Sequence, residues 1–257
     1  MSEKYFPKEV WALTAMDGLL EKQVPRLEAV LPTNKEQASK LRHDMALAML
    51  RDVVKALKGS KYIGDHILII SPDQRIREEV AQEVVFRQLQ NVEKGLNAAF
   101  DEGSQWLAEN KRADALLFIA PDLPLVTATA INRLIESDDG NSQRTIILCP
   151  SRGGGTTVIY KRPITLDFNP QYTNPTTNSQ TFRKHCIEAK RVLNGRPPLL
   201  FDSFVFSTDI DVEEDLIELE VHGQETETWE IVRTLLAYHG PNNRDYYFSP
   251  STHKSGV

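Results

Sequence analysis

Short apolar runs separated by longer amphipathic stretches constrain the fold of this 257-residue chain more than any other feature. The runs at 66–70 and 115–120 are mostly or wholly apolar, as expected of parallel strands that are buried on both faces. Stretches with the helical spacing of apolar residues surround them, at 35–58, 95–110 and 127–137. Strands that alternate with helices in this way predict an α/β domain.

Weaker signals complete the predicted order of elements. Further strands are expected at 10–16, 145–149 and 156–160, and further helices at 181–191, 212–221 and 225–238. Ser71-Pro72-Asp73 offers a cap and a first-turn proline for another helix. The segment 163–179 is rich in Pro, Asn and Thr and is expected to be a long loop, of a kind that often carries function.

Nothing in the sequence marks a linker between independent domains. We therefore expect a single domain over residues 1–240, followed by a polar tail over residues 241–257.

Composition narrows the classes of function. The longest apolar runs, at 45–50 and 115–120, are far shorter than the roughly 20 residues of a membrane span. The first residues lack the apolar core of a signal peptide, and Cys149 and Cys186 form no metal-binding pair, so we expect a cytoplasmic protein that does not bind membranes. A net charge of −6 without a basic block disfavours binding to nucleic acid, whereas a small phosphorylated ligand remains compatible.

Asp122 lies between two prolines, directly after the apolar run at 115–120. Binding sites in open α/β sheets form beyond the carboxyl ends of the strands, and the prolines restrict the backbone that aims this carboxylate. The alternative is a cap for the helix expected at 127–137. Asp122 is too distant in sequence for that role, and Thr127 caps the helix better. We therefore expect Asp122 to act in a functional site.

Asp209 and Asp211 form a second acidic motif. On an extended segment, residues two apart point to the same face, and two carboxylates there repel each other unless a cation lies between them. Mg²⁺ suits such oxygen ligands. The alternative is a helix start, with Asp211 as the N-cap and Glu213 and Glu214 in the first turn. Taken alone, the pair leaves both interpretations open.

Two glycine-containing segments could present backbone N–H groups to an anion. Gly153-Gly154-Gly155 lies between two predicted strands and matches neither a Walker A loop nor a dinucleotide fingerprint, and a plain hairpin turn is the alternative. Gly95-Leu-Asn97 begins a predicted helix, where free N–H groups favour a phosphate or a polar base edge. The alternative there is that Asn97 caps an ordinary helix. His185, on the helix predicted at 181–191, is expected at the surface.

Five motifs carry a family resemblance when they are taken together and in order. They are Gly-Leu-Asn-Ala-Ala at 95–99, Asp-Leu-Pro-Leu at 122–125, Gly-Gly-Gly-Thr at 153–156, Phe-Arg-Lys-His-Cys at 182–186, and Phe-Asp-Ser-Phe, Thr-Asp-Ile-Asp and Glu-Asp-Leu within 201–216. This order resembles the guanylyltransferases that begin side-chain assembly of the deazaflavin coenzyme F-420. That family joins GMP from GTP to 2-phospho-L-lactate, phosphoenolpyruvate or 3-phospho-D-glycerate and releases pyrophosphate.

The resemblance implies a Rossmann-like nucleotidyltransferase fold, with a mixed, mostly parallel sheet flanked by helices, and a possible homodimer. It also implies roles for individual residues. Mg²⁺ would be bound by Asp122, Asp209 and Asp211, the nucleotide by Gly95 and Asn97, and the acid by Gly155, Thr156, Asn178 and Thr181.

The N-terminal part departs from the family pattern. The first strand of the family usually ends in a Pro-x-Lys phosphate-binding loop, whereas this chain has Met16-Asp17 there. Arg26 matches an arginine of the family, so we expect it to bind the nucleotide and act in catalysis, with Lys22 replacing the lost lysine. Two alternatives remain open. One is a catalytically impaired nucleotide-binding or regulatory paralogue, and the other is a nucleotidyltransferase that acts on a different acceptor.

Overall fold

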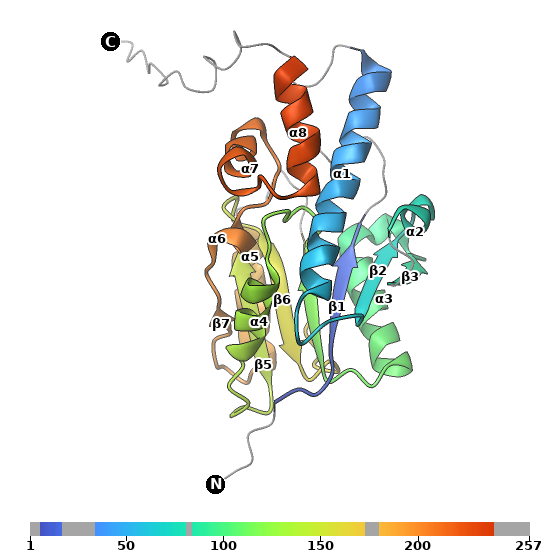
Figure 1. Ribbon diagram of the computed structural model, residues 1–257. Coiled ribbons are helices and arrows are strands. Elements are labelled where there is room, and N and C mark those ends of the chain that lie inside the picture. The colour runs from blue at the N-terminus through green and yellow to red at the C-terminus, as the bar shows by residue number, and fades with distance from the viewer. Residues whose placement is uncertain (1–5, 17–33, 81–83, 173–179, 239–257) are drawn as a thin grey trace, which may run out of the picture.

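The computed structural model describes residues 6–16, 34–80, 84–172 and 180–238 and shows a seven-stranded sheet between two layers of helices (Figure 1). The strand order is β3-β2-β1-β4-β6-β5-β7. The strands are β1 (Val10–Ala15), β2 (Ile67–Ser71), β3 (Val85–Gln88), β4 (Ala115–Ile119), β5 (Thr145–Pro150), β6 (Thr156–Arg162) and β7 (Leu199–Leu200). Among these described strands, only β6 runs antiparallel to its neighbours, so the sheet is mixed and mostly parallel, as predicted.

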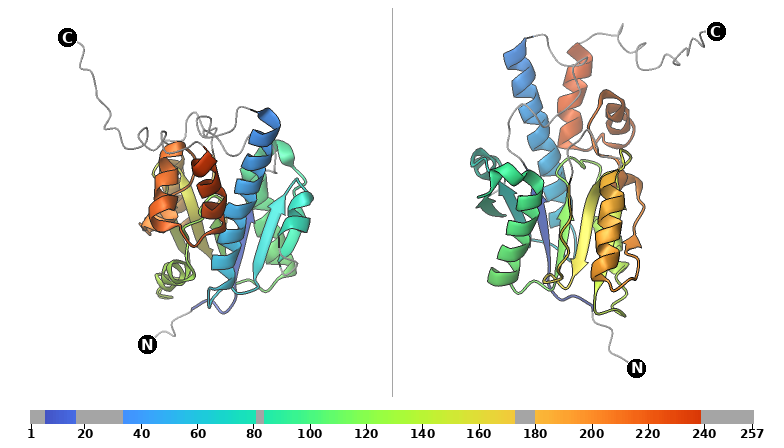
Figure 2. Two further views of the ribbon diagram at one scale, coloured as in Figure 1. Left: turned by 45° about the horizontal axis from the view of Figure 1, so that its top comes forward. Right: turned by 180° about the vertical axis from the view of Figure 1, so that it is seen from behind.

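Helices cover both faces of the sheet (Figure 2). One face carries α1 (Lys35–Lys58), α4 (Ala128–Glu136) and α8 (Glu227–Tyr238), and the other carries α3 (Gly95–Asn110) and α5 (Thr181–Val192). The shorter elements are α2 (Arg75–Glu79), η1 (Val92–Lys94), α6 (Phe204–Ser207), η3 (Glu213–Asp215) and α7 (Leu216–His222). Side chains alternate along each strand, so Ala12 packs in the core of one face and Leu13 in the core of the other.

A buried carboxylate joins two helices that are distant in sequence. Asp52 in α1 accepts hydrogen bonds from the backbone N–H groups of Glu227 (2.9 Å) and Thr228 (3.0 Å), and from the Thr228 hydroxyl (2.7 Å). These N–H groups belong to the first turn of α8, where they have no partner within the helix. Asp52 therefore fixes where α8 begins and holds it against α1.

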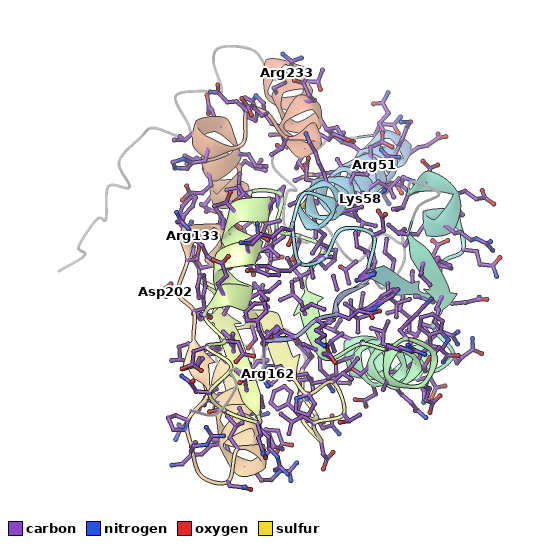
Figure 3. The ribbon with its side chains drawn as sticks, turned by 60° about the horizontal axis from the view of Figure 1, so that its bottom comes forward. Arg51, Lys58, Arg133, Arg162, Asp202 and Arg233 are labelled. Atoms are coloured by element: carbon purple, nitrogen blue, oxygen red, sulfur yellow. The ribbon has the colours of Figure 1, made fainter. Side chains whose placement is uncertain are left out.

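A second buried carboxylate, Asp138, follows α4. Arg162 donates to both of its oxygens, from Nε to Oδ2 at 2.5 Å and from Nη2 to Oδ1 at 2.8 Å. Tyr160 and Thr145 also donate to it, at 3.1 and 3.0 Å. Figure 3 shows Arg162 inside the molecule, whereas Arg51 and Arg233 lie near its periphery. This network ties the end of α4 to the hairpin of β5 and β6.

The strongest sequence patterns gave the most accurate elements. The helices predicted at 35–58 and 95–110 have these bounds in the structure. Thr127 caps α4 as expected, because its side chain accepts a hydrogen bond from the N–H of Ala130 at 3.2 Å. The cap predicted within Ser71-Pro72-Asp73 was correct only in part. Pro72 lies outside the first turn, because α2 begins at Arg75, but the Asp73 carboxylate accepts from the N–H of Arg75 at 3.0 Å.

Several predictions remain without a structural test. The tail at 241–257 lies outside the described residues, and the single-domain assignment stays a prediction. None of the helices in the described ranges combines the length and apolar character needed to cross a membrane.

Candidate active site

Asp122 lies just beyond the carboxyl end of β4, the central strand of the sheet, as the sequence predicts. The backbone brings a second acidic segment beside it, because the carbonyl of Asp122 accepts a hydrogen bond from the N–H of Ile210 at 3.1 Å. Ile210 separates Asp209 from Asp211. The structure thus brings together the two acidic motifs that the sequence analysis identified separately.

The electrostatics of these carboxylates are unfavourable without a cation. Asp122 Oδ1 is buried and has no hydrogen-bond partner among the described residues. Burial raises the pKa of Asp122 to about 8, and the negative charges of Asp211 and Asp209 contribute. Burial and the charge of Asp211 also raise the pKa of Asp209 to about 6, while Arg152 opposes this shift. A cation at this position would relieve both the repulsion and the desolvation.

Local hydrogen bonds hold the second acidic segment in place. The Thr157 hydroxyl donates to the Phe206 carbonyl at 2.5 Å, which ties β6 to α6. The Asp215 carboxylate accepts from the N–H groups of Asp211 and Val212, both at 2.9 Å. Asp215 therefore closes the turn into η3, a role related to the one that the helix-start alternative gave to Asp211.

The donor set bears on which metal could bind. No group of three or more His, Cys, Asp or Glu side chains within the described residues is arranged to hold a metal ion. Mg²⁺ usually takes only one or two protein carboxylates and completes its shell with water and phosphate oxygens. The buried, unpartnered oxygen of Asp122 fits such a partial ligand set, and the magnesium assignment of Asp122, Asp209 and Asp211 stays a prediction.

The glycine triplet forms the hairpin between β5 and β6, which was the structural alternative for it. The N–H of Gly154 donates to the Ser151 carbonyl (3.1 Å), and the N–H of Gly155 donates to the Ser151 hydroxyl (2.9 Å). Gly154 has φ +81°, which favours glycine. Two of the three glycine N–H groups are thus used inside the turn, which leaves little of the loop to cradle an anion.

His185 is buried beside Thr156, so the expectation that it lies at the surface was wrong. Its Nδ1 lies 2.9 Å from the Thr156 hydroxyl, and its ring stacks edge-on against Tyr172 at 4.8 Å between centroids. Burial lowers the pKa of His185 to about 4, and the Gln171 backbone partly opposes this effect. The spacing held a signal, because His185 continues the inward stripe of Thr181 and Ala189 along α5.

Tyr172 is a site residue that sequence reasoning missed. The Asn97 side chain holds its backbone from both sides, accepting from its N–H at 2.8 Å and donating to its carbonyl at 3.1 Å. The hydroxyl of Tyr172 is buried and has no hydrogen-bond partner in the described part of the chain. Burial and the charge of Asp122 raise the pKa of this hydroxyl, which places the two groups within electrostatic reach.

The remaining predicted site residues divide into two groups. Gly95 begins α3 with φ +53°, and Thr181 is the buried first residue of α5. Lys22, Arg26 and Asn178 lie outside the described residues.

The family comparison decides what kind of protein carries this site. The family model described as "Guanylyl transferase CofC like" matches residues 26–243, which is most of the chain. This chain belongs to the CofC-like guanylyl transferase family. The predictions of family and enzyme class, a nucleotidyltransferase of the guanylyltransferase type, are thereby confirmed.

Curated relatives of this CofC-like chain agree. A 2-phospho-L-lactate guanylyltransferase from Methanocaldococcus sp. is 31% identical over 191 residues, covering 74% of this chain and 75% of the relative. The protein of the same name from Methanobrevibacter ruminantium is 27% identical over 231 residues, covering 82% and 92%.

Solved structures confirm the predicted nucleotidyltransferase fold. A protein from Desulfovibrio desulfuricans described as a nucleotide-diphospho-sugar transferase gives a TM-score of 0.66 at 14% identity, covering 90% of this chain and 96% of its own. A nucleotidyl transferase from Methanothermobacter thermautotroptrophicus gives a TM-score of 0.54 at 15% identity, covering 88% and 99%. At these identities the likeness concerns the fold alone.

Proposed function

We propose that this CofC-like chain is a Mg²⁺-dependent enzyme that transfers GMP from GTP to a small phosphorylated acid. The curated relatives are named for 2-phospho-L-lactate, which makes it the first acceptor to test, followed by phosphoenolpyruvate and 3-phospho-D-glycerate. One observation carries the proposal. A buried carboxylate oxygen of Asp122 has no hydrogen-bond partner among the described residues and lies beside two further carboxylates at the carboxyl end of the central strand.

The carboxylates Asp122 and Asp209 would hold Mg²⁺, with Asp211 close by. Bound there, Mg²⁺ would neutralise charge on the phosphates of GTP. The raised pKa of Asp122 means that this carboxyl group gives up its proton when a cation binds. The role of these side chains is thus to bind and orient, and neither serves as a nucleophile.

The chemistry needs no covalent bond to the protein. A phosphate oxygen of the acid forms a bond to the α-phosphorus of GTP, the bond from that phosphorus to the bridging oxygen breaks, and pyrophosphate leaves. The attacking phosphate is already anionic, so it requires no strong base. Catalysis then consists of positioning the two substrates and compensating the charge that develops on pyrophosphate.

Thr156 and His185 support binding of the acid beside the carboxylates. With a pKa of about 4, the His185 ring is neutral near pH 7. When its Nδ1 carries the proton and donates to Thr156, the Thr156 hydroxyl proton is available for an oxygen of the acid. Thr181 and Asn178 would complete this side, as the family resemblance implies, whereas Gly155 would act through the shape of the hairpin turn, because its N–H already donates to Ser151.

The residues proposed to bind the nucleotide are supported mainly by the sequence. Arg26 and Lys22 would bind the phosphates of GTP in place of the missing lysine. Gly95 and Asn97 would lie near the nucleotide. The Asn97 amide also holds the backbone of Tyr172. Asn97 would therefore act on binding partly through the position of the Tyr172 hydroxyl, on which the charge of Asp122 acts.

The deciding experiment combines the purified full chain with GTP, Mg²⁺ and each of the three acids, and measures pyrophosphate release. We expect release with at least one acid, slower release with ATP or CTP, and none in excess EDTA. Asp202→Asn is the matched control for Asp209→Asn in this assay and should leave pyrophosphate release unchanged. Asp202 is an exposed carboxylate on the same stretch of chain as Asp209. Sedimentation of the same sample tests the homodimer.

Two results would overturn the proposal. Turnover that persists in excess EDTA would exclude the metal role of the carboxylates. Binding of GTP without release of pyrophosphate from it in the presence of any of the three acids would favour the regulatory paralogue or a different acceptor.

A further inference from the structure

Two buried oxygen atoms near the carboxyl end of β4 have no hydrogen-bond partner among the described residues. One is Oδ1 of Asp122, and the other is the hydroxyl oxygen of Tyr172. A carboxylate oxygen accepts hydrogen bonds, and a tyrosine hydroxyl can donate one. Buried polar groups are nearly always paired, so an acceptor and a donor that are both left unpaired in one region require an explanation.

The ring of Tyr172 lies at the same end of the sheet as Asp122. It packs against Phe118 of β4, at 5.9 Å between ring centroids, and Phe118 precedes Asp122 by four residues. It also meets His185 edge-on, at 4.8 Å. His185 contacts Thr156 at 2.9 Å, and Thr156 begins β6, whose first residues pair with the end of β4. Contacts to both strands therefore hold the ring beside the proposed metal site.

The hydroxyl of Tyr172 is held in place and ready to donate. The Asn97 side chain accepts from the backbone N–H of Tyr172 at 2.8 Å and donates to its carbonyl at 3.1 Å. A tyrosine side chain has only two rotatable bonds, so a fixed backbone and two ring contacts leave the hydroxyl little freedom. Burial and the negative charge of Asp122 raise the pKa of this hydroxyl, so it keeps its proton near pH 7.

The pair of Tyr160 and Asp138 shows the completed form of such an arrangement. The Tyr160 hydroxyl donates to Asp138 Oδ2 at 3.1 Å, and Arg162 supplies the positive charge that this carboxylate needs. At Asp122, the described charges that act on the carboxylate are negative. A bound cation would supply the missing positive charge, and the Tyr172 hydroxyl would then correspond to that of Tyr160.

We propose that Tyr172 is a positioning residue of the metal site, whose hydroxyl donates a hydrogen bond to the Asp122 carboxylate when a divalent cation binds. The inference rests on the metal role that the proposed function gives to Asp122. One carboxylate oxygen then faces the cation and the other accepts from Tyr172, so the hydroxyl fixes the orientation of the metal ligand. Tyr172 contacts neither substrate in this arrangement and acts through Asp122.

The variant Tyr172→Phe removes the hydroxyl and keeps the ring. Binding of Mn²⁺ to the purified full chain, followed through the electron paramagnetic resonance signal of free Mn²⁺, reports on the metal site without turnover. We expect Tyr172→Phe to weaken Mn²⁺ binding by about tenfold or more, as is typical when a hydrogen bond to a metal ligand is lost. Without metal, the variant should be as resistant to urea as the wild type, because the lost hydroxyl has no partner there.

Kinetics separate this role from direct binding of a substrate. In the pyrophosphate assay, the Mg²⁺ concentration that gives half of the maximal rate should rise by about the same factor as the dissociation constant of Mn²⁺. The kcat at saturating Mg²⁺ and the KM for the acid should each change by less than about threefold, because Tyr172 touches neither substrate.

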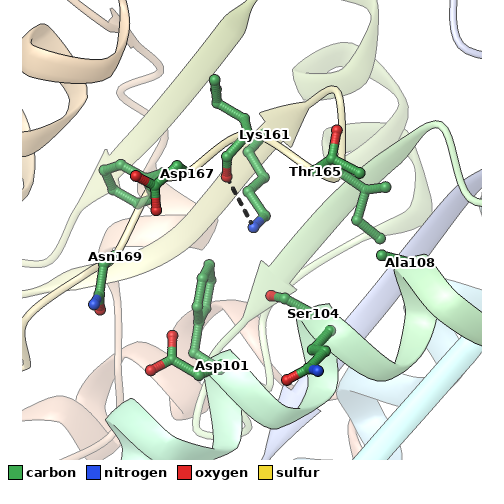
Figure 4. A pocket seen from close by; sticks show the side chains of 12 residues that line it. Asp101, Ser104, Ala108, Lys161, Thr165, Asp167 and Asn169 are labelled. Atoms are coloured by element: carbon green, nitrogen blue, oxygen red, sulfur yellow. Dashed lines mark hydrogen bonds between the residues drawn. The ribbon is translucent and has the colours of Figure 1, made fainter.

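Ser104→Ala is the control for the loss of an unpaired buried hydroxyl. The Ser104 hydroxyl also has no partner in the described part of the chain. It lies beside a pocket of about 300 Å³ that Lys161 also lines (Figure 4). Lys161 pairs with Leu116 near the start of β4, whereas Asp122 follows the end of that strand. We therefore expect Ser104→Ala to leave Mn²⁺ binding unchanged.

Tyr160→Phe is the control for the loss of a hydroxyl that serves a structural carboxylate. It removes one of the donors to Asp138. We expect it to lower the urea concentration at the midpoint of unfolding and to leave the affinity for Mn²⁺ unchanged. The two tyrosine variants should thus have opposite effects on metal binding and on stability.

Three outcomes would overturn the inference, and they differ in what they leave of the proposed function. Equal Mn²⁺ affinity of the wild type and Tyr172→Phe would exclude the positioning role and leave the proposed function intact. A raised KM for the acid with unchanged Mn²⁺ affinity would place the hydroxyl on the acid instead. Failure of the wild-type chain to bind Mn²⁺, with or without GTP, would remove the metal site itself and the inference with it.

Discussion

Two carboxylates, those of the buried Asp138 and the half-buried Asp122, lie at opposite ends of the hairpin of β5 and β6 and have opposite surroundings. Asp138 meets Arg162 through two hydrogen bonds and also accepts from Tyr160 and Thr145. Asp122 has a buried oxygen that finds no hydrogen-bond partner in the part of the chain that the structure describes, and the described charges that act on it are those of Asp211 and Asp209. The same side chain is satisfied by the protein in one place and left unsatisfied in the other.

This difference separates a structural carboxylate from a functional one. A buried charge destabilises the folded state unless it is paired and hydrogen-bonded. Asp138 meets that requirement within the chain, so it needs no ligand. At Asp122, the described residues supply no cation close to the carboxylate. A bound cation would supply what Arg162 supplies to Asp138.

The largest expected effect is on stability, at Asp138. Asp138→Ala leaves the guanidinium of Arg162 buried without its carboxylate, and we expect the free energy of unfolding to fall by about 3–5 kcal/mol. Denaturation in urea, followed by circular dichroism, measures this change. Asp139→Ala, at the exposed neighbouring position, is the control and should change stability by less than about 0.5 kcal/mol. A small change in the free energy of unfolding for Asp138→Ala would mean that the Asp138 carboxylate does not have a structural role.

The second effect is on activity, at Asp122. Asp122→Asn keeps the shape of the side chain, and we expect kcat/KM for guanylyl transfer to fall by about 10²–10³-fold. The free energy of unfolding should stay the same or rise, because a buried charge next to two other carboxylates is removed. Adding Asp209→Asn should reduce activity by less than the product of the two single effects, since both residues act through one metal. A variant that loses stability and keeps its activity would reverse the assignment of the two carboxylates.

A third prediction concerns the cations that should complement the carboxylate site. Arg26→Ala should lower kcat/KM by about 10²–10³-fold if its guanidinium clamps the phosphates of GTP through two hydrogen bonds. Lys22→Ala should have a smaller effect, because a flexible point charge is less well placed. Both residues lie outside the described part of the structure, so steady-state kinetics are the direct test. Changes below about threefold in both variants would refute this placement of the two cations.

The sequence predicted an element accurately where the signal lay within that element alone. The bounds of α1 and α3 were predicted because the spacing of apolar residues along one helix is a local property. β3 and β7 were missed, since they are short and depend on pairing with strands that are distant in sequence. β7 even has exposed leucines, Leu199 and Leu200, and therefore shows no burial pattern.

The same distinction separates the site residues that were predicted from the one that was missed. Asp122 was found because it follows a predicted strand, and Asp209 and Asp211 were found because two carboxylates two residues apart are visible in the sequence. Their juxtaposition became certain only with the hydrogen bond from Ile210 to Asp122. Tyr172 has no comparable local signal, because its position depends on Asn97, which is remote in sequence.

The final expected effect is a pH dependence of stability at Asp122. Burial and the neighbouring carboxylates raise the pKa of Asp122 from 3.8 to about 8. Between these values the folded chain keeps a proton that the unfolded chain has released, so stability falls as the pH rises, by at most about 1.4 kcal/mol per pH unit. Asp209, with a pKa of about 6, adds to the lower part of this range.

Asp122→Asn removes this contribution, so its advantage in unfolding free energy over the wild type should grow from pH 5 to pH 8. Urea denaturation at several pH values measures the difference between the two proteins, which cancels groups that titrate in both. At pH 8, saturating Mg²⁺ should stabilise the wild type and have little effect on the variant, because a bound cation favours the ionised carboxylate. A constant difference across this range, with no response to Mg²⁺, would mean that Asp122 is as well compensated as Asp138.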